Sequence, residues 1–257
     1  EFAVMMEDVP PLSQIPDMKA AVVSQYGQNN AGGAERYIRK VCSRLEADHR
    51  IEVLRLATDA GQVSGLSQPS ISFFATGWSW KWFFELKRIL RTQRPDVLYL
   101  HHTVPGLTDT AFWAGKDLGM PTVLMYHSDV TGCGLLKKTL GHVYFLTLGR
   151  RMLTACDRVL VSSGTYAANS PFLSRIQRQY IHAPPGLDPA PTRTHLGKAG
   201  TGQGSKGTNL DPMQNRPFLL FVGKPDLAEK GFRILQRAWE HLIRDGMDLD
   251  LCVAGES

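Results

Sequence analysis

The chain has 257 residues, of which 43% are apolar and 21% charged, and its formal net charge is +5. This composition is typical of a globular protein and excludes a disordered, collagen-like or disulfide-stapled chain. At about 100–200 residues per domain, the length allows one large domain or two modest ones. No apolar run reaches the ~18 residues that cross a bilayer, and the acidic start from Glu1 to Asp8 is unlike a signal peptide.

The four cysteines are scattered along the chain and form no C-x-x-C pair of the kind that binds metal. Scattered thiols suit a reducing compartment, so we expect a cytoplasmic protein. Cys42 falls on an apolar helix face, which predicts a place in the core. The chain does not begin with Met, which leaves open that it is a piece of a longer protein.

Short apolar runs that predict buried strands alternate with longer segments of helical period. In chain order, the expected elements are strand 19–24, helix 34–45, strands 51–56 and 71–74, helix 78–91, strand 97–101, helix 108–118, strand 122–127, helix 135–156 with a break at Gly141 or Gly149, strand 158–162, helix 166–176, strands 179–183 and 218–222, helix 230–243 and strand 249–254. Apolar strands joined by helices predict a Rossmann-like α/β fold, whose parallel sheet is covered on both faces. Ligands of such folds bind at the carboxyl ends of the strands.

A Gly-rich, polar segment at 192–216 predicts a flexible linker or an exposed insertion. We therefore expect a first domain at 1–191 and the beginning of a second Rossmann-like domain at 217–257. Residues 130–210 hold ten Lys or Arg against only Asp157 and Asp188. This local excess indicates nucleic acid, a phosphorylated small molecule or an acidic membrane as partner, or else a solvated basic surface.

Two segments after predicted strands are candidates for binding an anion. Gly32 and Gly33 precede the first helix, where backbone N–H groups and the helix dipole favour phosphate, although glycines also serve a tight turn. Lys224 and Lys230 flank the loop after strand 218–222 and could neutralise a diphosphate as point charges, or could simply be solvated.

Histidines follow two other predicted strands. His127 stands at the end of strand 122–127, where it could donate to a sugar hydroxyl or a phosphate, or could be a hydrogen-bonded strand end. The pair His101-His102 ends strand 97–101 in the same way. With no third ligand at a recognisable spacing, we predict no metal site.

Taken in order, these segments resemble the retaining glycosyltransferases of family 4, which have the two-domain GT-B fold. The segments that carry the resemblance are GGAER (32–36), RPDVLYLH (94–101), YHSD (126–129), ACDRV (155–159), SS (162–163), PGLD (185–188), FVG (221–223) and KG (230–231).

The resemblance implies transfer of a sugar from a nucleotide-diphosphate donor to an acceptor hydroxyl with retention, and without a cofactor or a catalytic metal. It implies that Gly32 and Gly33 approach the donor phosphates, that Lys224 and Lys230 stabilise the diphosphate leaving group, and that His127 is the catalytic contact to the transferred sugar. The acceptor would be a glycan or a lipid-linked molecule, in the synthesis of cell-surface polysaccharide or glycolipid.

The chain departs from the family pattern in two respects. Lys224 stands where the family commonly has Arg, so charge is kept but bidentate phosphate binding is lost. The paired glutamates that bind the donor are missing from the sequence, and we therefore expect little or no transferase activity from these 257 residues alone.

Several alternatives remain open at this point. Basic, apolar segments at 135–151 and 78–91 could lie on anionic lipid at the cytoplasmic membrane face, or could pack on the sheet. The chain could be a non-catalytic binding remnant of the same fold. A Rossmann oxidoreductase lacks support because G-x-G-x-x-G is missing, and nucleic-acid binding lacks support because its motifs are missing.

Overall fold

The computed structural model describes residues 17–25, 32–49, 51–58, 66–73, 76–129, 135–184, 217–226 and 230–255. The chain divides into two compact units, one within 1–187 and the other within 188–257. The predicted linker at 192–216 lies outside the described residues. Each unit is described below by itself.

The first unit is built on a six-stranded parallel sheet with the order β2-β1-β5-β6-β7-β8. Its strands are β1 (Lys19–Ser24), β2 (Glu52–Leu56), β5 (Val97–His102), β6 (Thr122–Tyr126), β7 (Arg158–Val161) and β8 (Ile181–His182). The prediction of a parallel sheet from apolar strands is confirmed. All six carboxyl ends therefore lie at one edge of the sheet.

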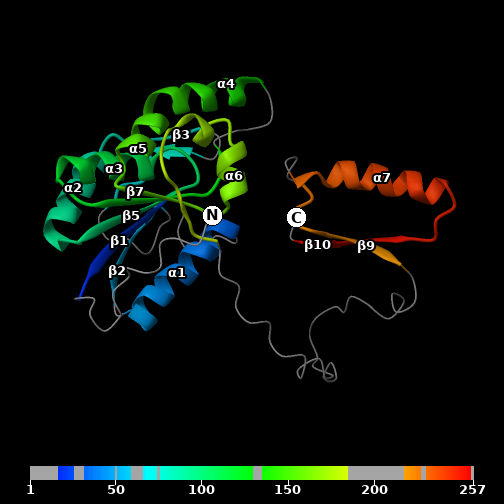
Figure 1. The fold of residues 1–257 in the computed structure, drawn as a ribbon, viewed down its shortest axis with the longest axis horizontal. Helices are drawn as coiled ribbons and strands as arrows, with labels where there is room; N and C mark the ends of the chain where they lie inside the picture. The colour runs from blue at the N-terminus through cyan, green and yellow to red at the C-terminus, as the bar shows by residue number, and fades with distance from the viewer. Residues whose placement is uncertain are drawn as a thin grey trace. The chain divides into compact units, whose positions relative to one another are not determined.

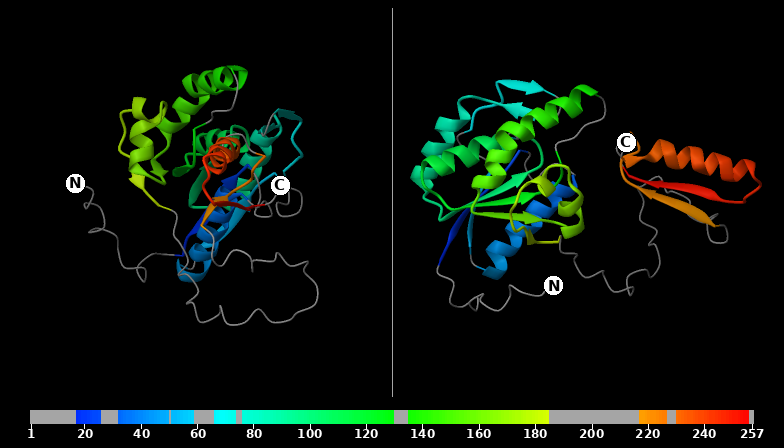
Figure 2. Two further views of the ribbon diagram at one scale, coloured as in Figure 1. Left: turned by 90° about the vertical axis from the view of Figure 1, so that its right-hand side faces the viewer. Right: turned by 45° about the horizontal axis from the view of Figure 1, so that its top comes forward.

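Helices cover both faces of this sheet, as Figure 1 and the right-hand view of Figure 2 show. They are α1 (Gly33–His49), α2 (Trp82–Gln93), α3 (Leu107–Asp117), α4 (Leu135–Tyr144), α5 (Arg150–Ala155) and α6 (Gly164–Asn169). Helix α1 lies on one face, and α2, α3 and α5 lie on the other. The larger apolar core forms on the side of α2, α3 and α5.

Alternation along β1 shows how the strands serve both faces. Ala21 and Val23 join the larger core, whereas Val22 packs with Ile38 and Cys42 of α1 in a smaller cluster. Successive strand residues point to opposite faces, so a strand covered on both sides must be apolar throughout. Cys42 is fully buried, which confirms its prediction as a core residue.

The region 71–91 differs from its prediction. Instead of a third parallel strand followed by a helix from residue 78, the chain forms an antiparallel pair of β3 (Ile71–Phe73) and β4 (Thr76–Trp78), outside the main sheet. Helix α2 begins only at Trp82, which is buried and donates from Nε1 to the carbonyl of Ser67 at 2.8 Å. This tertiary contact sets the start of the helix, whereas the apolar pattern alone placed it four residues earlier.

The predicted long helix at 135–156 is present, and its α-helical geometry is interrupted in a turn that ends at Gly149, one of the two predicted glycines, and not at Gly141. A π-helical turn (Phe145–Gly149) joins α4 to α5, and the amide of Arg150 donates to the carbonyl of Phe145, five residues back. The predicted helix 166–176 is also divided, into α6 and a 3-10 turn (Leu173–Arg175). Ser170 separates them, and its hydroxyl accepts from the amides of Phe172 and Leu173.

The second unit contains one strand–helix–strand repeat. Strand β9 (Phe218–Val222) and strand β10 (Asp250–Ala254) pair in parallel, and α7 (Phe232–Arg244) connects them. Trp239 of α7 donates from Nε1 to the carbonyl of Leu249 at 2.9 Å, which holds the helix on the strands. In the part of the chain that the structure describes, no helix combines the length and the apolar character needed to cross a membrane.

Candidate functional site

Buried polar side chains of the first unit gather at the carboxyl edge of the sheet. They lie at the end of β1 or β5, directly follow β1, or belong to the first turn of α3: Ser24, Gln25, His101, His102, Thr108, Asp109 and Thr110. Burying polar groups is costly unless they are hydrogen-bonded, so a cluster of them marks a place where hydrogen bonds hold side chains in fixed positions. This edge is also where ligands bind in open α/β sheets.

His127 is the central side chain of this edge. It follows β6 directly, and its amide donates to the carbonyl of His102 at 3.2 Å, so the neighbouring strand fixes its backbone. Its Nε2 lies 3.0 Å from Nδ1 of His101, which ends the adjacent strand β5. The ring of Tyr37, from α1, meets the His127 ring edge-on at 5.5 Å and the His101 ring at 6.0 Å.

The two imidazoles are neutral near pH 7. Burial, with a smaller contribution from His102, lowers the pKa of His127 to about 4. Burial, followed by the proximity of His127, lowers the pKa of His101 well below its ordinary value. Since the charged form is disfavoured in both, the pair offers hydrogen bonds to a ligand rather than a positive charge.

His102 points to the opposite face of the sheet, because neighbouring strand residues alternate. Its Nε2 lies 2.8 Å from the hydroxyl of Tyr144 at the end of α4, and that hydroxyl donates to a carboxylate oxygen of Asp109 in α3. The rings of Tyr126 and Tyr144 both lie nearly parallel to the His102 ring, with their centroids 5.4 and 5.8 Å from its centroid. This chain of polar contacts ties β5 to α3 and α4.

The start of α3 is held by side chains from distant segments. Gln25, after β1, accepts from the amide of Leu107 at 2.8 Å and donates to the carbonyl of Gly77 at 3.3 Å. Gly106 adopts a φ of 135°, and a Cβ there would lie 2.5 Å from the same Gly77 carbonyl. The amide of Gly106 donates to Asp109 at 2.8 Å. These contacts fix the loop that follows β5.

Gly32 and Gly33 lie at the start of α1, as predicted. The carbonyl of Gly32 accepts the first helical hydrogen bond, from the amide of Arg36 at 3.1 Å. A Cβ on Gly32 would lie 1.9 Å from a carboxylate oxygen of Glu35, which folds back over the start of the helix. A carboxylate there complements the helix dipole, so an incoming phosphate can occupy the same place only if Glu35 turns away.

The structure brings the start of α1 and His127 to the same edge, since Tyr37 of α1 contacts the His127 ring. Lys224 and Lys230 belong to the second unit, where both are exposed. Lys224 follows β9, and Lys230 precedes Gly231, which caps the start of α7 with a φ of 72°. The two lysines therefore flank the connection from β9 to α7, as their spacing predicted.

Asp129, the last residue of the YHSD segment, has a supporting position beside His127. One of its carboxylate oxygens accepts from the hydroxyls of Tyr126 at 3.0 Å and Ser170 at 2.6 Å. Its amide donates to the hydroxyl of Tyr166 at 2.6 Å. The loop after β6 is thus tied to β6 itself and to α6, which limits the movement of His127.

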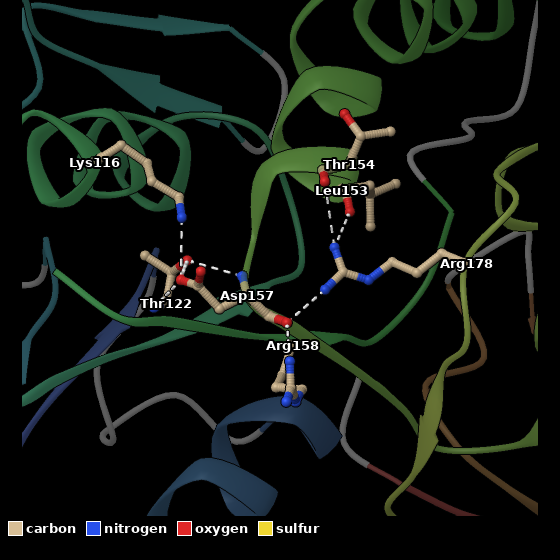
Figure 3. A network of polar contacts seen from close by, with 7 residues as sticks. All are labelled: Lys116, Thr122, Leu153, Thr154, Asp157, Arg158 and Arg178. Atoms are coloured by element: carbon tan, nitrogen blue, oxygen red, sulfur yellow. Dashed lines mark hydrogen bonds and ion pairs between the residues drawn. The ribbon is translucent and has the colours of Figure 1, made fainter. Parts of the chain in front are cut away.

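The ACDRV segment serves the opposite edge of the sheet (Figure 3). A carboxylate oxygen of Asp157 accepts from the amide and the hydroxyl of Thr122, both at 2.7 Å, and from Lys116 at 3.0 Å. Arg178 donates to the carbonyls of Leu153 and Asp157. These contacts join α3, α5 and the amino ends of β6 and β7, so this part of the motif is structural.

Three contacts of the candidate site were not predicted from the sequence: the pairing of His101 with His127, the position of Tyr37, and the chain from His102 to Asp109. The first could have been found, because both histidines end strands that are consecutive in a parallel sheet.

Within the described ranges, no three His, Cys, Asp or Glu side chains lie close enough together to hold a metal ion. The PGLD segment (185–188) lies outside those ranges.

Two solved structures resemble the chain in fold. MnaA of S. aureus, solved with UDP, shares 12% identity at a TM-score of 0.54, over 93% of this chain and 63% of its own. A protein described as a UDP-N-acetylglucosamine 2-epimerase from Listeria monocytogenes shares 11% at a TM-score of 0.52, over 93% and 62%. The chain thus spans less than two thirds of their length. At such identity the likeness shows the fold alone, and that fold is of the GT-B type.

A comparison with curated protein sequences finds no significant match. The family model described as Glycosyltransferase Family 4 matches residues 31–189. This range begins just before Gly32 and includes the parallel strands β2, β5, β6, β7 and β8, with His101 and His127 at the carboxyl ends of β5 and β6. Because the match extends over more than half of its residues, the chain belongs to Glycosyltransferase Family 4.

Proposed function

We propose that the chain is part of a glycosyltransferase, which moves a sugar from a nucleotide-diphosphate donor to an acceptor hydroxyl with retention, in the synthesis of cell-surface polysaccharide or glycolipid. Membership of the family supports this proposal. The observation that carries it is the neutral, half-buried imidazole of His127 at the carboxyl edge of the sheet, where its ring contacts Tyr37 of α1. In this proposal the first unit binds the acceptor, and the second unit begins the donor-binding domain.

Each candidate residue has a separate role in this proposal. The amides at Gly32 and Gly33 bind the donor phosphates, and His127 donates a hydrogen bond near the transferred sugar. Lys224 and Lys230 stabilise the charge that develops on the diphosphate as the glycosidic bond breaks. A donor phosphate oxygen takes the proton of the acceptor hydroxyl, so the reaction uses no side-chain nucleophile and no metal.

Binding and transfer are tested separately. The melting temperature and calorimetric titrations of the chain with UDP-glucose and GDP-mannose reveal donor binding, since a ligand that binds only the folded state stabilises it. We expect His127→Ala to weaken the binding of the recognised donor about tenfold, the value of one hydrogen bond. His142→Ala, an exposed substitution on α4, is the control. Binding that is unchanged in His127→Ala would contradict the assigned role.

Transfer of a radiolabelled sugar from the same donors separates an enzyme from a binding protein. We expect little or no turnover from these 257 residues, because the donor-binding glutamates of the family are not among them. Robust turnover would contradict that expectation and support the enzyme directly. Donor binding without turnover in any longer form of the protein would favour the non-catalytic reading.

A specific observation also favours a membrane partner. The surface of α4, the π-helical turn and α5 exposes six large apolar side chains: Leu135, Leu136, Leu140, Val143, Leu146 and Leu148. Lys138, Arg150 and Arg151 are exposed on the same continuous segment, and residues 135–156 contain no acidic side chain. A helix with these two features lies on anionic lipid, which would bring a lipid-linked acceptor to the first unit.

Sedimentation with vesicles tests this membrane contact. We expect the chain to bind vesicles that contain phosphatidylglycerol, and binding to weaken in salt. The triple substitution Lys138→Gln, Arg150→Gln and Arg151→Gln should reduce binding roughly 100-fold, at about 1 kcal/mol for each basic residue. Three matched substitutions outside both candidate membrane segments, Lys19→Gln, Arg39→Gln and Arg158→Gln, are the control. Equal loss in both variants, or binding to neutral vesicles alone, would argue against this surface.

A further inference from the structure

The contact between His101 and His127 determines more than the position of the two rings. His101 is fully buried, and its Nδ1 lies 3.0 Å from Nε2 of His127. The other ring nitrogen of His101, Nε2, is also buried and has no hydrogen-bond partner among the described residues. No described residue makes a hydrogen bond to Nδ1 of His127 either.

A neutral imidazole has one N–H donor and one acceptor nitrogen, so the pair can be arranged in two ways. If His127 donated from Nε2, the proton of His101 would sit on its buried Nε2, where nothing accepts it. If His101 donates from Nδ1, its buried Nε2 is an acceptor without a partner. An orphaned buried N–H is rarer and more costly than an orphaned acceptor, which favours the second arrangement.

Three aromatic rings fix the plane of the His101 ring. Tyr99, two residues earlier on β5, contacts it with ring centroids 4.4 Å apart, and Tyr37 meets it edge-on at 6.0 Å. The His127 ring lies 5.3 Å away, with 27° between the two planes. Within this plane, the contact of Nδ1 with Nε2 of His127 sets which nitrogen of His101 faces His127.

We propose that His101 is a positioning residue, which donates from Nδ1 to Nε2 of His127 and so holds the proton of His127 on Nδ1. His127 then offers an N–H donor, not a lone pair, and the atom that it recognises is an acceptor oxygen of a phosphate or of a sugar hydroxyl. It cannot act as a general base through Nε2, because that nitrogen is already engaged. The identity of the ligand rests on the proposed function, whereas the tautomer does not.

The tautomer is measured without a ligand. Side-chain ¹H–¹⁵N spectra of the histidine-labelled chain distinguish Nδ1–H from Nε2–H, and His127→Gln assigns the His127 signals. We expect the Nδ1–H form for His127. Finding the Nε2–H form in the unmodified chain would overturn the proposal, even if every variant of His101 failed to fold.

Two variants of His101 separate positioning from packing. His101→Asn keeps an N–H donor near the Nδ1 position and should keep His127 in the Nδ1–H form. His101→Leu keeps the bulk but removes the donor, and should leave His127 as a mixture of tautomers. A folded His101→Leu variant with the tautomer of the unmodified chain would contradict the positioning role.

Affinity for UDP and UDP-glucose then identifies the acceptor oxygen. We expect His101→Leu to weaken binding about 3- to 10-fold, and His101→Asn to restore it to within about twofold. An equal effect on both ligands assigns the contact to a phosphate, and an effect on UDP-glucose alone assigns it to the sugar. If neither ligand binds the unmodified chain, the proposed function fails with these donors while the tautomer measurement stands.

Discussion

Gly33 carries no side chain, although nothing among the residues that the structure describes in the first unit requires this. A Cβ at Gly33 would meet no atom within 4 Å, and its φ is not in the left-handed region. Gly106 is different, because its φ of 135° and the nearby carbonyl of Gly77 both exclude a side chain. We expect a glycine at an exposed helix start, where its described neighbours leave room for a side chain, if a ligand approaches the backbone there.

The substitution Gly33→Ala tests whether this glycine serves the fold or the binding of a ligand. We expect the substitution to raise the free energy of unfolding by about 0.4–1 kcal/mol, because alanine restricts the unfolded chain and fits the folded one. It should also weaken the binding of the nucleotide sugar, since the methyl group obstructs access to the amides. Urea unfolding and calorimetric titration measure the two effects, with Ser43→Ala, exposed on the same helix, as control. Unchanged affinity would mean that no ligand reaches these amides.

The sequence identified the side chains of this edge better than their contacts. His127, Gly32 and Gly33 were predicted because each follows a strand or precedes a helix, and local pattern is sufficient for that. The contact of Tyr37 with His127 depends on the packing angle of α1 on the sheet, which the sequence does not show. Burial of His101 likewise follows from neighbours more than 20 residues away.

At the scale of elements, two aspartates of the family segments perform the same task at the amino ends of strands. Asp96 precedes β5, accepts from the amide of Lys19 at 2.7 Å and donates its own amide to the Lys19 carbonyl. Asp157 precedes β7 and makes the same reciprocal contacts with Thr122, the first residue of β6. Each aspartate thus fixes the register of two neighbouring parallel strands.

Asp157→Ala tests this role. Burial alone would raise the pKa of Asp157, but hydrogen bonds from Thr122 and then from Lys116 lower it to about 2. We expect the substitution to cost about 1–3 kcal/mol of the free energy of unfolding, because the Thr122 amide loses a charged acceptor. Asp117→Ala, which removes only an exposed ion pair with Lys87, should cost much less. Equal costs in urea unfolding would show that the register contact contributes nothing.

Strands with continuous apolar runs, such as β1 and β6, were predicted from the sequence nearly to the residue, because burial on both faces leaves a strong signal. A strand at 71–74 was predicted, and β3 lies there, but β4 and its antiparallel pairing with β3 were missed. Ile71 and Trp78 are exposed at the ends of this pair, so no apolar run marks β4. Trp78 is held instead by a hydrogen bond from its Nε1 to Thr110 of α3, a contact that local sequence does not predict.

At the scale of the whole molecule, two buried histidines and the half-buried His127 make stability depend on pH. Burial is the largest influence on His101, His102 and His127 and lowers each pKa below the ordinary value of 6.5. Asp109 partly opposes the shift at His102. Below pH 6.5 the unfolded chain therefore binds protons that the folded chain does not. The free energy of unfolding thus decreases as the pH is lowered.

We expect the free energy of unfolding to decrease from pH 7 to pH 4. With its pKa at about 4, His127 alone contributes roughly 3 kcal/mol of this decrease, at about 1.4 kcal/mol for each pH unit between the two pKa values. Urea unfolding at intervals of pH measures the slope, which should be shallower in His127→Gln than in the unmodified chain. A slope that is the same in His127→Gln would mean that His127 takes up its proton in the folded state.

The π-helical turn between α4 and α5 constrains how this region can change in length. It accommodates one residue more than an α-helical turn would, while Tyr144 still reaches His102 and Met152 and Leu153 still face the core. We expect the deletion of one residue from Phe145–Gly149 to restore an ordinary α-helix and to leave these three side chains in place, whereas a second deletion would rotate everything beyond it by about 100°. A gap of one residue is therefore tolerated in this turn, and a gap of two is not.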